Sequence, residues 1–459
     1  MNPYKGTLEY ISPKGANTLR VLFLGTSGID KEDYVRKCAD IAYNEKFTRG
    51  RSDPNAEQYL KIFDLDGAIK EKIGGTPGYT AYLDNPNRDA QNRLWNETFY
   101  DILSKTGKYQ NEPHIFLILH GVYYRNKNYF SCINRDLLLK FHPTVIVTLI
   151  DDAYDVSSTI GQRERTLKTR SICSFAEAIE WRTVEILMGD ILARNLYIDP
   201  TQFTLGTENL AEFNAELSRL FRRPIPHFTL AVKHGPQVLY RLLFERWRLV
   251  LYSAYPITST RTGQAKIAEI NEYRKSVNES FTVFDPAMID ELLVVDKSKT
   301  PSEEIERIKT NGFMAEERGQ YALLKRLPVV FDINDPDKLA EHSEYMDDFI
   351  ELKELIKRQI VQRDFRLVRQ STGLTAYRPY WGGKKTPSGG VDREMIEAIG
   401  QNTPTYVVHA SEKDGEPEVM FRGMETAIIT TSLKELLQEL EIWQKNTREE
   451  RSEPDTWED

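Results

Sequence analysis

Short, almost continuously apolar runs alternate along the chain with longer segments in which apolar residues recur at helical spacing. A strand that is buried on both faces of a parallel sheet is apolar throughout, whereas a surface helix is apolar on one side only. The alternation therefore predicts an α/β fold built on parallel sheets with helices on both faces. In the first half of the chain, the runs interpreted as strands are residues 18–25, 59–66, 114–121, 144–152 and 226–235.

The same pattern predicts the helices of the first half and one hairpin. The segment "KEDYVRKCADIAYNEKF" follows the first apolar run and has helical spacing, as do residues 87–106, 172–195 and 236–245. The stretch "YYRNKNYFSCI" places a polar turn between two aromatic runs, which is typical of a β-hairpin.

The pattern of strands and helices restarts near residue 246. We therefore predict two doubly wound parallel-sheet domains, at 1–245 and 246–459. Residues 297–343 are charged and contain three prolines, which predicts an insertion, and the polar tail 447–459 predicts disorder. The remaining strands are predicted at 248–258, 281–286, 373–379, 404–410 and 426–431, and helices at 262–278 and 344–363.

Composition narrows the class of protein. A chain of 459 residues is longer than domains with a single hydrophobic core usually are, which agrees with two domains. The balance of 61 basic and 69 acidic residues argues against a general nucleic-acid or membrane-surface role. Because Cys38, Cys132 and Cys173 lie far apart and no apolar run reaches the length of a membrane span, we expect a soluble cytoplasmic protein with free thiols.

The loop "LFLGTSGIDKEDY" stands between the first strand and the first helix, where a phosphate-binding P-loop would lie. Such a loop needs glycines that let backbone N–H groups surround a phosphate, and a lysine for its oxygens. Gly25, Gly28 and Lys31 meet these needs. Asp30 and Glu32, however, replace the second glycine and the Mg²⁺-binding hydroxyl, and their carboxylates would repel a phosphate.

With these residues the first half, over 18–195, resembles the adenylate-kinase-like P-loop kinases in a degenerate form. The resemblance implies a nucleotide-kinase-like fold that binds a nucleotide or a partner rather than transferring a phosphoryl group, with ATP and Mg²⁺ as candidate ligands. Asp151 and Asp152 are the candidate metal ligands after the fourth strand. The candidate lid cations, for which a solvated charged helix start is the alternative interpretation, are Arg163, Arg165, Lys168 and Arg170.

In the second half, three stretches are considered together: 250–263 ends a strand in a loop, 363–379 is a helix that runs into a strand, and 387–395 opens the next helix. Ligands of open α/β sheets bind outside the carboxyl ends of the strands, so these stretches are expected to lie together. Tyr252 and Pro256 form a "Y-x-x-x-P" strand end, and "SGGVDRE" places Ser388 ahead of Glu394 at the start of a helix.

This combination resembles the nucleoside 2-deoxyribosyltransferase-like family over residues 248–431. The resemblance implies that Glu394 is the nucleophile and that Tyr252 orients it. Serine at 388, where members acting on free nucleosides have aspartate, resembles the branch that hydrolyses nucleoside 5′-monophosphates. A hydroxyl and glycine N–H groups at a helix start attract a phosphate, whereas a carboxylate repels it. The predicted phosphate contacts are Ser388, Gly389, Gly390, Ser259, Thr260 and Arg261.

The base-side residues are less well matched. Thr372 stands where the family has an aspartate, so Asp364, Asp392 or a partner subunit's residue is left to protonate the leaving base. Trp381 is a candidate for stacking on the base; an ordinary exposed loop is the alternative. His120 and His234 are interpreted as structural.

Three functions follow. The first is an N-glycosidase that needs no cofactor and acts on a nucleoside 5′-monophosphate or NAD, with a regulatory nucleotide-binding first half, in nucleotide metabolism or antiviral defence. The second is a nucleotide kinase, and the third is a non-catalytic nucleotide sensor. A Ser-Gly-Gly helix cap without catalysis is the structural alternative at 388–390. The family resemblance also implies a homo-oligomer whose neighbouring chains complete each pocket.

Overall fold

The computed structural model divides into two compact units at Val232 and Lys233. The residues it describes are 19–47, 60–106, 114–153, 155–156, 159–160, 175–198, 223–257, 264–289, 291, 343–381, 384–385, 388–409 and 427–451. The sequence placed the boundary at 245/246. It lies earlier because helix α9 (Pro236–Phe244) packs on the edge strand of the second sheet, and Arg241 of this helix donates to the Phe281 carbonyl at 2.9 Å.

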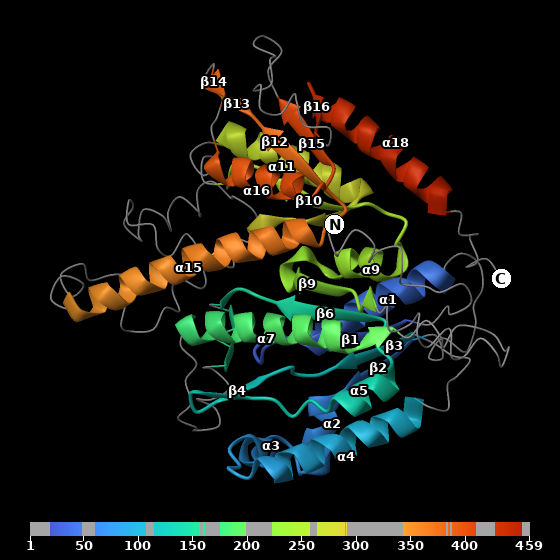
Figure 1. Cartoon of the computed structure of the whole chain (residues 1–459), viewed down its shortest axis with the longest axis vertical. Helices are drawn as coiled ribbons and strands as arrows, with labels where there is room; N and C mark the ends of the chain where they lie inside the picture. The colour runs from blue at the N-terminus through green and yellow to red at the C-terminus, as the bar shows by residue number, and fades with distance from the viewer. Residues whose placement is uncertain are drawn as a thin grey trace. The chain divides into compact units, whose positions relative to one another are not determined.

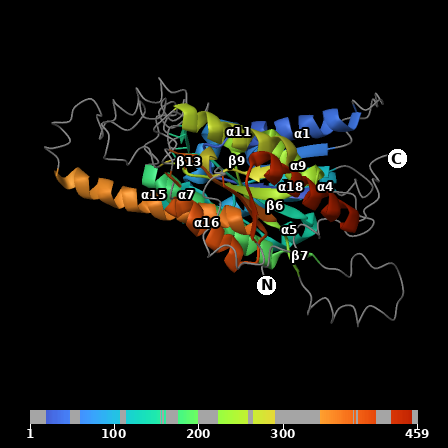
Figure 2. The ribbon, with the colours of Figure 1, turned by 90° about the horizontal axis from the view of Figure 1, so that it is seen from above.

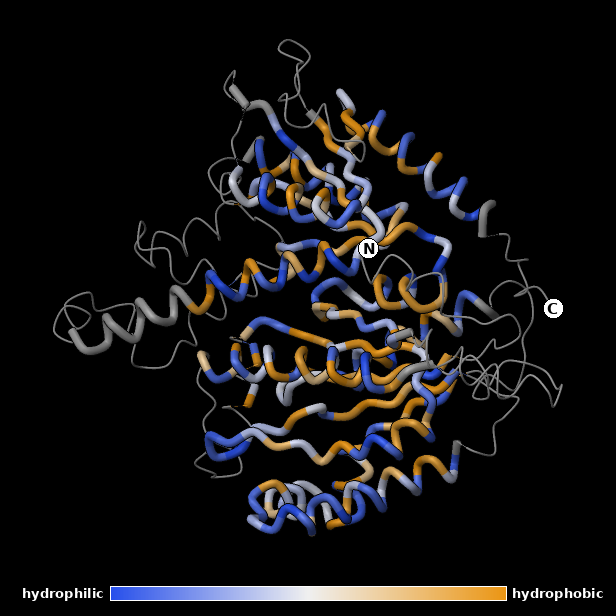
Figure 3. Tube along the Cα trace, in the orientation of Figure 1, coloured by the Kyte–Doolittle hydropathy of each residue, from blue (hydrophilic) through white to orange (hydrophobic). Residues whose placement is uncertain are grey.

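The first unit contains a five-stranded parallel sheet in the order β2-β3-β1-β6-β9 (Figure 1). Its strands are β1 (Arg20–Leu24), β2 (Leu60–Asp64), β3 (His114–Ile118), β6 (Val145–Ile150) and β9 (His227–Ala231). All five match apolar runs of the sequence, and Figure 3 shows the hydrophobic colour concentrated along these strands. The chain leaves β1 toward β2 and leaves β6 toward β9, so the connections reverse direction at the centre of the sheet.

Helices surround this sheet. They are α1 (Lys31–Phe47), α2 (Leu65–Lys72), α3 (Thr76–Leu83), α4 (Arg88–Thr106), α5 (Arg135–Phe141) and α7 (Phe175–Asn195). The predicted hairpin is present as β4 (Tyr123–Arg125) and β5 (Asn128–Phe130), and β7 (Tyr197–Ile198) pairs with β8 (Arg223–Pro224). Figure 2 shows α1 and α7 on opposite sides of the sheet. The prediction of an α/β fold with covered parallel sheets is confirmed.

The second unit contains a five-stranded parallel sheet in the order β11-β10-β12-β15-β16. Its strands are β10 (Val250–Ala254), β11 (Thr282–Phe284), β12 (Gly373–Arg378), β15 (Thr405–His409) and β16 (Ala427–Thr430). In chain order this is 2-1-3-4-5, a doubly wound order whose connections reverse between the first and third strands. The ligand position that this order favours is therefore the carboxyl end of β10 and β12.

The helical segments of the second unit are η4 (Val232–His234), α9, α11 (Gln264–Ser280), η5 (Pro286–Met288), α15 (Ser343–Arg369), α16 (Gly389–Gly400) and α18 (Leu433–Arg451). A small hairpin joins β13 (Tyr380–Trp381) to β14 (Lys384–Lys385). Figure 2 shows α11 and α16 on opposite sides of the sheet.

Two sequence-based boundaries change. Helix α18 continues to Arg451, so the prediction of disorder from 447 is wrong for residues 447–451; residues 452–459 lie outside the described part. Helix α15 begins at Ser343, the last residue of the predicted insertion, and the rest of 297–343 lies outside the described residues. Cys38 and Cys132 are buried free thiols as predicted, whereas Cys173 lies outside the described residues. None of the described helices combines the length and apolar composition needed to cross a membrane.

Candidate functional site

The second unit brings Tyr252 and Glu394 together at the point where its sheet connections reverse. The Tyr252 hydroxyl on β10 donates to Oε1 of Glu394 on α16 at 2.8 Å, and both side chains are buried. Alternate residues of a strand face opposite sides of the sheet. Accordingly Tyr252 faces α16, whereas the next residue, Ser253, contacts Tyr273 of α11 on the other side at 3.2 Å.

The start of α16 is built as a helix cap. The Ser388 hydroxyl accepts a weak hydrogen bond from the Val391 N–H at 3.4 Å, and Gly389 and Gly390 form an exposed first turn. A Cβ at Gly389 would meet no atom within 4 Å, so packing does not require glycine there. Glu394 follows on the buried face of the helix, together with Val391, Met395 and Ala398.

A second carboxyl group influences Glu394. Burial, and next the charge of Asp364, raise the pKa of Glu394 well above its ordinary range, while the Tyr252 hydroxyl and Arg363 oppose this shift. Burial also raises the pKa of Asp364, although Arg363 donates to it at 2.9 Å. Two buried carboxyl groups that interact in this way favour retaining one proton between them.

Arg363 anchors this carboxyl pair to the rest of the unit. Besides Asp364, it donates to the carbonyl oxygens of Pro286, at 3.2 Å, and Ile289. Burial opposes its charge, but Asp364 and the buried Glu291 outweigh burial and raise the pKa of Arg363. The Arg363 guanidinium therefore interacts electrostatically with three carboxyl groups, those of Glu291, Asp364 and Glu394.

The structure corrects the assignment of Thr372 to the base side. Thr372 precedes β12, at the amino end of the strand, away from the carboxyl edge where ligands bind. Its hydroxyl accepts from the Val250 N–H at 3.0 Å and donates to the Val250 carbonyl at 2.8 Å. Thr372 therefore ties two strands together. Asp392, another base-side alternative, pairs with Arg378 at 3.1 Å and keeps 34% of its side chain exposed.

Several predicted residues fall outside the described part of the chain. These are Ser259, Thr260, Arg261, Arg163, Arg165, Lys168 and Arg170. Trp381 lies in β13, but its side chain is outside the described part. Their roles stay predictions.

In the first unit, the glycine-containing loop joins β1 to α1 as predicted. Gly25 and Gly28 have φ angles of 152° and 102°. A Cβ at Gly25 would lie 2.7 Å from the Leu149 carbonyl oxygen, so no side chain fits there. Asp30 and Glu32, the two carboxylates expected to repel a phosphate, are directed to the helix surface. Asp30 accepts from the Asp33 N–H at 3.2 Å, and Glu32 pairs with exposed Arg36.

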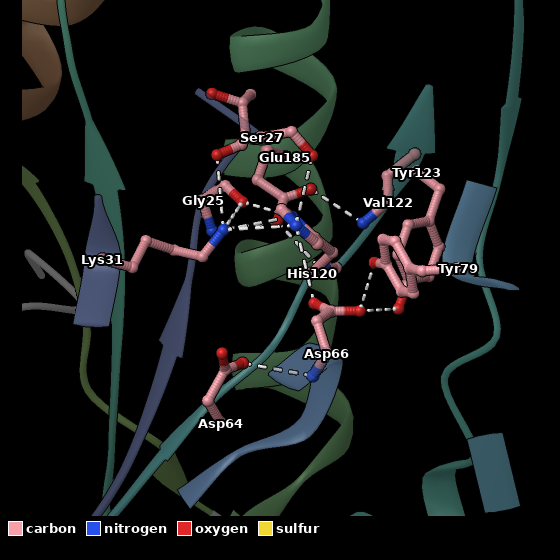
Figure 4. Close-up of polar contacts among 12 residues, drawn as sticks. Gly25, Ser27, Lys31, Asp64, Asp66, Tyr79, His120, Val122, Tyr123 and Glu185 are labelled. Carbon is pink, nitrogen blue, oxygen red and sulfur yellow. Dashed lines mark hydrogen bonds and ion pairs between the residues drawn. The ribbon is translucent and has the colours of Figure 1, made fainter. Parts of the chain in front are cut away.

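Lys31 is buried and turned back into its own loop (Figure 4). Its ammonium donates to the carbonyl oxygens of Gly25 at 2.8 Å and Thr26 at 3.3 Å, and lies 3.2 Å from Nδ1 of His120. The same Nδ1 lies 2.7 Å from the Gly25 carbonyl oxygen. Burial and Lys31 lower the pKa of His120 to about 4, so this imidazole is neutral near pH 7.

Asp66 supplies a negative charge to this cluster. Its Oδ1 accepts from the Tyr79 hydroxyl at 2.7 Å and the Tyr123 hydroxyl at 2.8 Å, and its Oδ2 lies 3.5 Å from Nε2 of His120. Burial would raise the pKa of Asp66, but His120, the two tyrosines and Lys31 outweigh burial and lower it.

Glu185 of α7 contacts the Gly25 loop and the residues that follow β3 (Figure 4). Its Oε1 accepts from the N–H groups of Gly25 at 3.0 Å and Gly121 at 2.7 Å, and its Oε2 accepts from Val122 at 2.7 Å. The side chain is fully buried, and burial raises its pKa to about 7 although these hydrogen bonds and Lys31 oppose the shift.

Sequence reasoning missed Asp66, Tyr79, Tyr123 and Glu185, and it treated His120 as structural. Asp66 and His120 each lie two residues after the end of a strand, β2 and β3, so the rule that ligands gather at strand ends gave a usable signal for both. Glu185 lies within an apolar helical stretch and gave none. His234 accepts from the Asp285 N–H at 2.8 Å, in keeping with its expected structural role.

The first unit also contains a Thr–His–Asp chain of hydrogen bonds. Nε2 of His227 lies 2.8 Å from the Thr148 hydroxyl, and its Nδ1 lies 2.9 Å from Asp190. Hydrolases use such an order for nucleophilic catalysis. Here Thr148 has no exposed surface and lies within the sheet, so the chain joins β6, β9 and α7 rather than serving a substrate.

The metal prediction at Asp151 gains no support from the described residues, which contain no group of three or more His, Cys, Asp or Glu side chains arranged to hold a metal ion. The Asp151 carboxylate instead accepts from the Asp152 N–H at 2.8 Å.

Comparison of the chain with models of known protein families and with curated proteins finds no match.

Proposed function

We propose that the second unit cleaves the N-glycosidic bond of a nucleotide, with a nucleoside 5′-monophosphate as the substrate class and Glu394 as the nucleophile. The observation that carries this proposal is the 2.8 Å hydrogen bond from Tyr252 to Glu394, located where a 2-1-3-4-5 sheet favours ligand binding. Residues far apart in the sequence meet there in the pairing that the family resemblance implied.

The chemistry follows from the carboxyl pair. Cleavage of an N-glycosidic bond passes through a cation-like sugar, which a carboxylate stabilises and then captures at the anomeric carbon. One Glu394 oxygen forms the new C–O bond as the C–N bond breaks, and the electron pair of the C–N bond leaves with the base. The base takes up the one proton that the interacting carboxyl groups of Glu394 and Asp364 share. Water then attacks the anomeric carbon, releases Glu394 and returns a proton.

The start of α16 is suited to the phosphate end of the substrate. The N–H groups of a first helical turn carry partial positive charge, and an uncharged Ser388 does not repel a phosphate dianion. Binding the phosphate one turn from Glu394 would hold the sugar beside the carboxylate.

The first unit is proposed to bind a nucleotide for regulation or sensing. Supporting this are the glycine loop at the reversal point of its sheet and Lys31 at the start of α1. Such a pairing suits nucleotide metabolism or antiviral defence, in a cytoplasmic homo-oligomer.

The test is release of free base from a panel of nucleoside 5′-monophosphates, their 2′-deoxy forms and NAD, followed by chromatography. Glu394→Gln is expected to lower release by at least about 1,000-fold. The matched control is Glu397→Gln on the same helix, because Glu397 pairs with exposed Arg369 outside the carboxyl pair. No release from any substrate refutes the glycosidase. Mg²⁺-dependent ADP formation that is lost in Lys31→Ala would instead favour the kinase.

A further inference from the structure

The anion cradle of the first unit lies at the carboxyl ends of adjacent strands β1 and β3. The N–H groups of Gly25, which follows β1, and of Gly121 and Val122, which follow β3, converge on one carboxylate, that of Glu185 (Figure 4). Several backbone N–H groups converging beside a lysine form the type of site that binds phosphoryl groups. Here the protein's own side chain occupies it.

The charge of Glu185 is costly at this position. The Glu185 carboxylate has no exposed surface, and burying an ionised group costs free energy that a neutral acceptor such as glutamine avoids. Burial accordingly raises its pKa to about 7, so near neutral pH the group is close to losing its charge. A glutamine would offer one acceptor oxygen, for the N–H groups of Gly25 and Gly121, and would turn an amide N–H toward the Val122 N–H.

The charges around the Gly25 loop disfavour the binding of an anion in addition to the Glu185 carboxylate. Lys31 acts on the carboxyl groups of Glu185, Asp66 and Asp64. Lys70 of α2 also acts on His120, which is neutral near pH 7. Arg182, on α7 itself, donates to the Asp151 carbonyl at 3.1 Å. A phosphoryl group that entered beside Lys31 would add negative charge to this set. Binding therefore requires Glu185 to become neutral or to leave the three N–H groups.

We propose that Glu185 is an internal competitor for a phosphoryl-binding site formed by Gly25, Gly121, Val122 and Lys31, and that the site binds a ligand's phosphoryl group when Glu185 is uncharged. This inference rests on the proposed nucleotide binding by the first unit and is independent of the glycosidase chemistry. It makes the first unit a nucleotide site whose affinity rises as the pH falls through neutrality.

The test measures binding of inorganic tripolyphosphate to the full chain by calorimetry at pH 8 and pH 6. Glu185→Gln keeps one acceptor oxygen for the N–H groups of Gly25 and Gly121 and removes the charge, so at pH 8 it should bind about ten-fold more tightly than wild type. At pH 6 the ratio should approach one, since wild-type Glu185 is then mostly protonated. Comparing the two proteins at each pH cancels the titration of the probe itself.

Two controls make the result specific. Glu180→Gln removes the same charge from an exposed position of α7 and should match wild type at both pH values. Adding Lys31→Ala to Glu185→Gln should abolish the gain. Equal affinity of wild type and Glu185→Gln at pH 8, or a gain that survives Lys31→Ala, overturns the proposal. If Glu185→Gln does not fold, calorimetry of wild type in buffers of different ionisation enthalpy decides: proton uptake beyond that of the probe supports the proposal, and none overturns it. Tripolyphosphate has no glycosidic bond, so base release by the second unit remains a separate result.

Discussion

The hydroxyl of Tyr252 and the carboxylate of Glu394 are joined at 2.8 Å although 142 positions separate them in the sequence. The tyrosine lies on a central strand and the acid on the helix that follows the neighbouring strand. The hydrogen bond favours the ionised acid and fixes one of its oxygens. The hydrogen bond from Tyr252 thereby orients the Glu394 carboxyl group and opposes the effect of burial, which favours its neutral form.

Tyr252→Phe tests this orientation. The change keeps the ring and removes the donor that lowers the pKa of Glu394, so the ionised nucleophile forms only at higher pH. Base release near pH 7 should fall by about ten- to a hundred-fold, which corresponds to the loss of one charge-assisted hydrogen bond. The pH at which the rate of base release rises should shift to a higher value. If the pH–rate profile of Tyr252→Phe equals that of wild type, Tyr252 contributes only to packing.

Ser388→Asp tests recognition of the phosphate. Aspartate caps a helix as well as serine does, so the fold should be retained. A carboxylate beside the phosphate repels it, and KM for a nucleoside 5′-monophosphate should rise by about ten-fold or more. KM for the corresponding nucleoside is the internal control and should change little. A parallel rise for both substrates would place the phosphate elsewhere.

Thr372→Val tests the corrected role of that residue. The change leaves the buried Val250 N–H without its side-chain acceptor, so the free energy of unfolding should fall by about 1–3 kcal/mol. Denaturant unfolding measures this loss. Base release by the folded fraction should be unaffected, and a selective loss of activity without a loss of stability would restore a base-side role.

Glu185→Gln should change how stability depends on pH. The pKa of Glu185 is raised in the folded chain from 4.5 to about 7, so its contribution is complete below pH 4.5 and is lost as pH rises through 7. The pKa of His120 is lowered from 6.5 to about 4, so its contribution is present above 6.5 and is lost as pH falls through 4. The two trends oppose each other in the wild type.

Without Glu185, the His120 trend is no longer offset. Relative to wild type, the variant should lose stability between pH 7 and pH 5, by up to about 1.4 kcal/mol per pH unit. Urea unfolding at pH 5, 6 and 7 measures the difference, with Glu180→Gln as the control that should parallel wild type. A difference that does not vary with pH would show that Glu185 is not titrating in this range.

The sequence predicted the strands well because burial on both faces leaves an unbroken apolar run, as in β1, β3 and β6. It placed α9 in the wrong unit because an amphipathic helix shows that it is covered, not which sheet covers it. The polar end of α18 was taken for disorder because charge alone does not distinguish a tail from an exposed last helical turn. Both errors concern tertiary contacts, and the local sequence pattern of a segment does not show which other segment it packs against.

The candidate site shows the same division. Tyr252 and Glu394 were identified because each belongs to a short motif at a strand or helix end. Thr372 was misassigned by position in the motif, since only the structure shows it at the amino end of β12. Glu185 had no local signal, because its importance comes from three N–H groups on two loops distant in sequence.

The central claim is that Glu394 forms a bond to the anomeric carbon, and the stereochemistry of the reaction tests it most directly. With methanol present as a competing acceptor, nuclear magnetic resonance of the methyl glycoside first formed reports the anomeric configuration. Attack by Glu394 followed by attack of methanol inverts that carbon twice, so the account predicts retention of the nucleotide's configuration. An inverted product would show direct attack by the acceptor and would contradict Glu394 as the nucleophile.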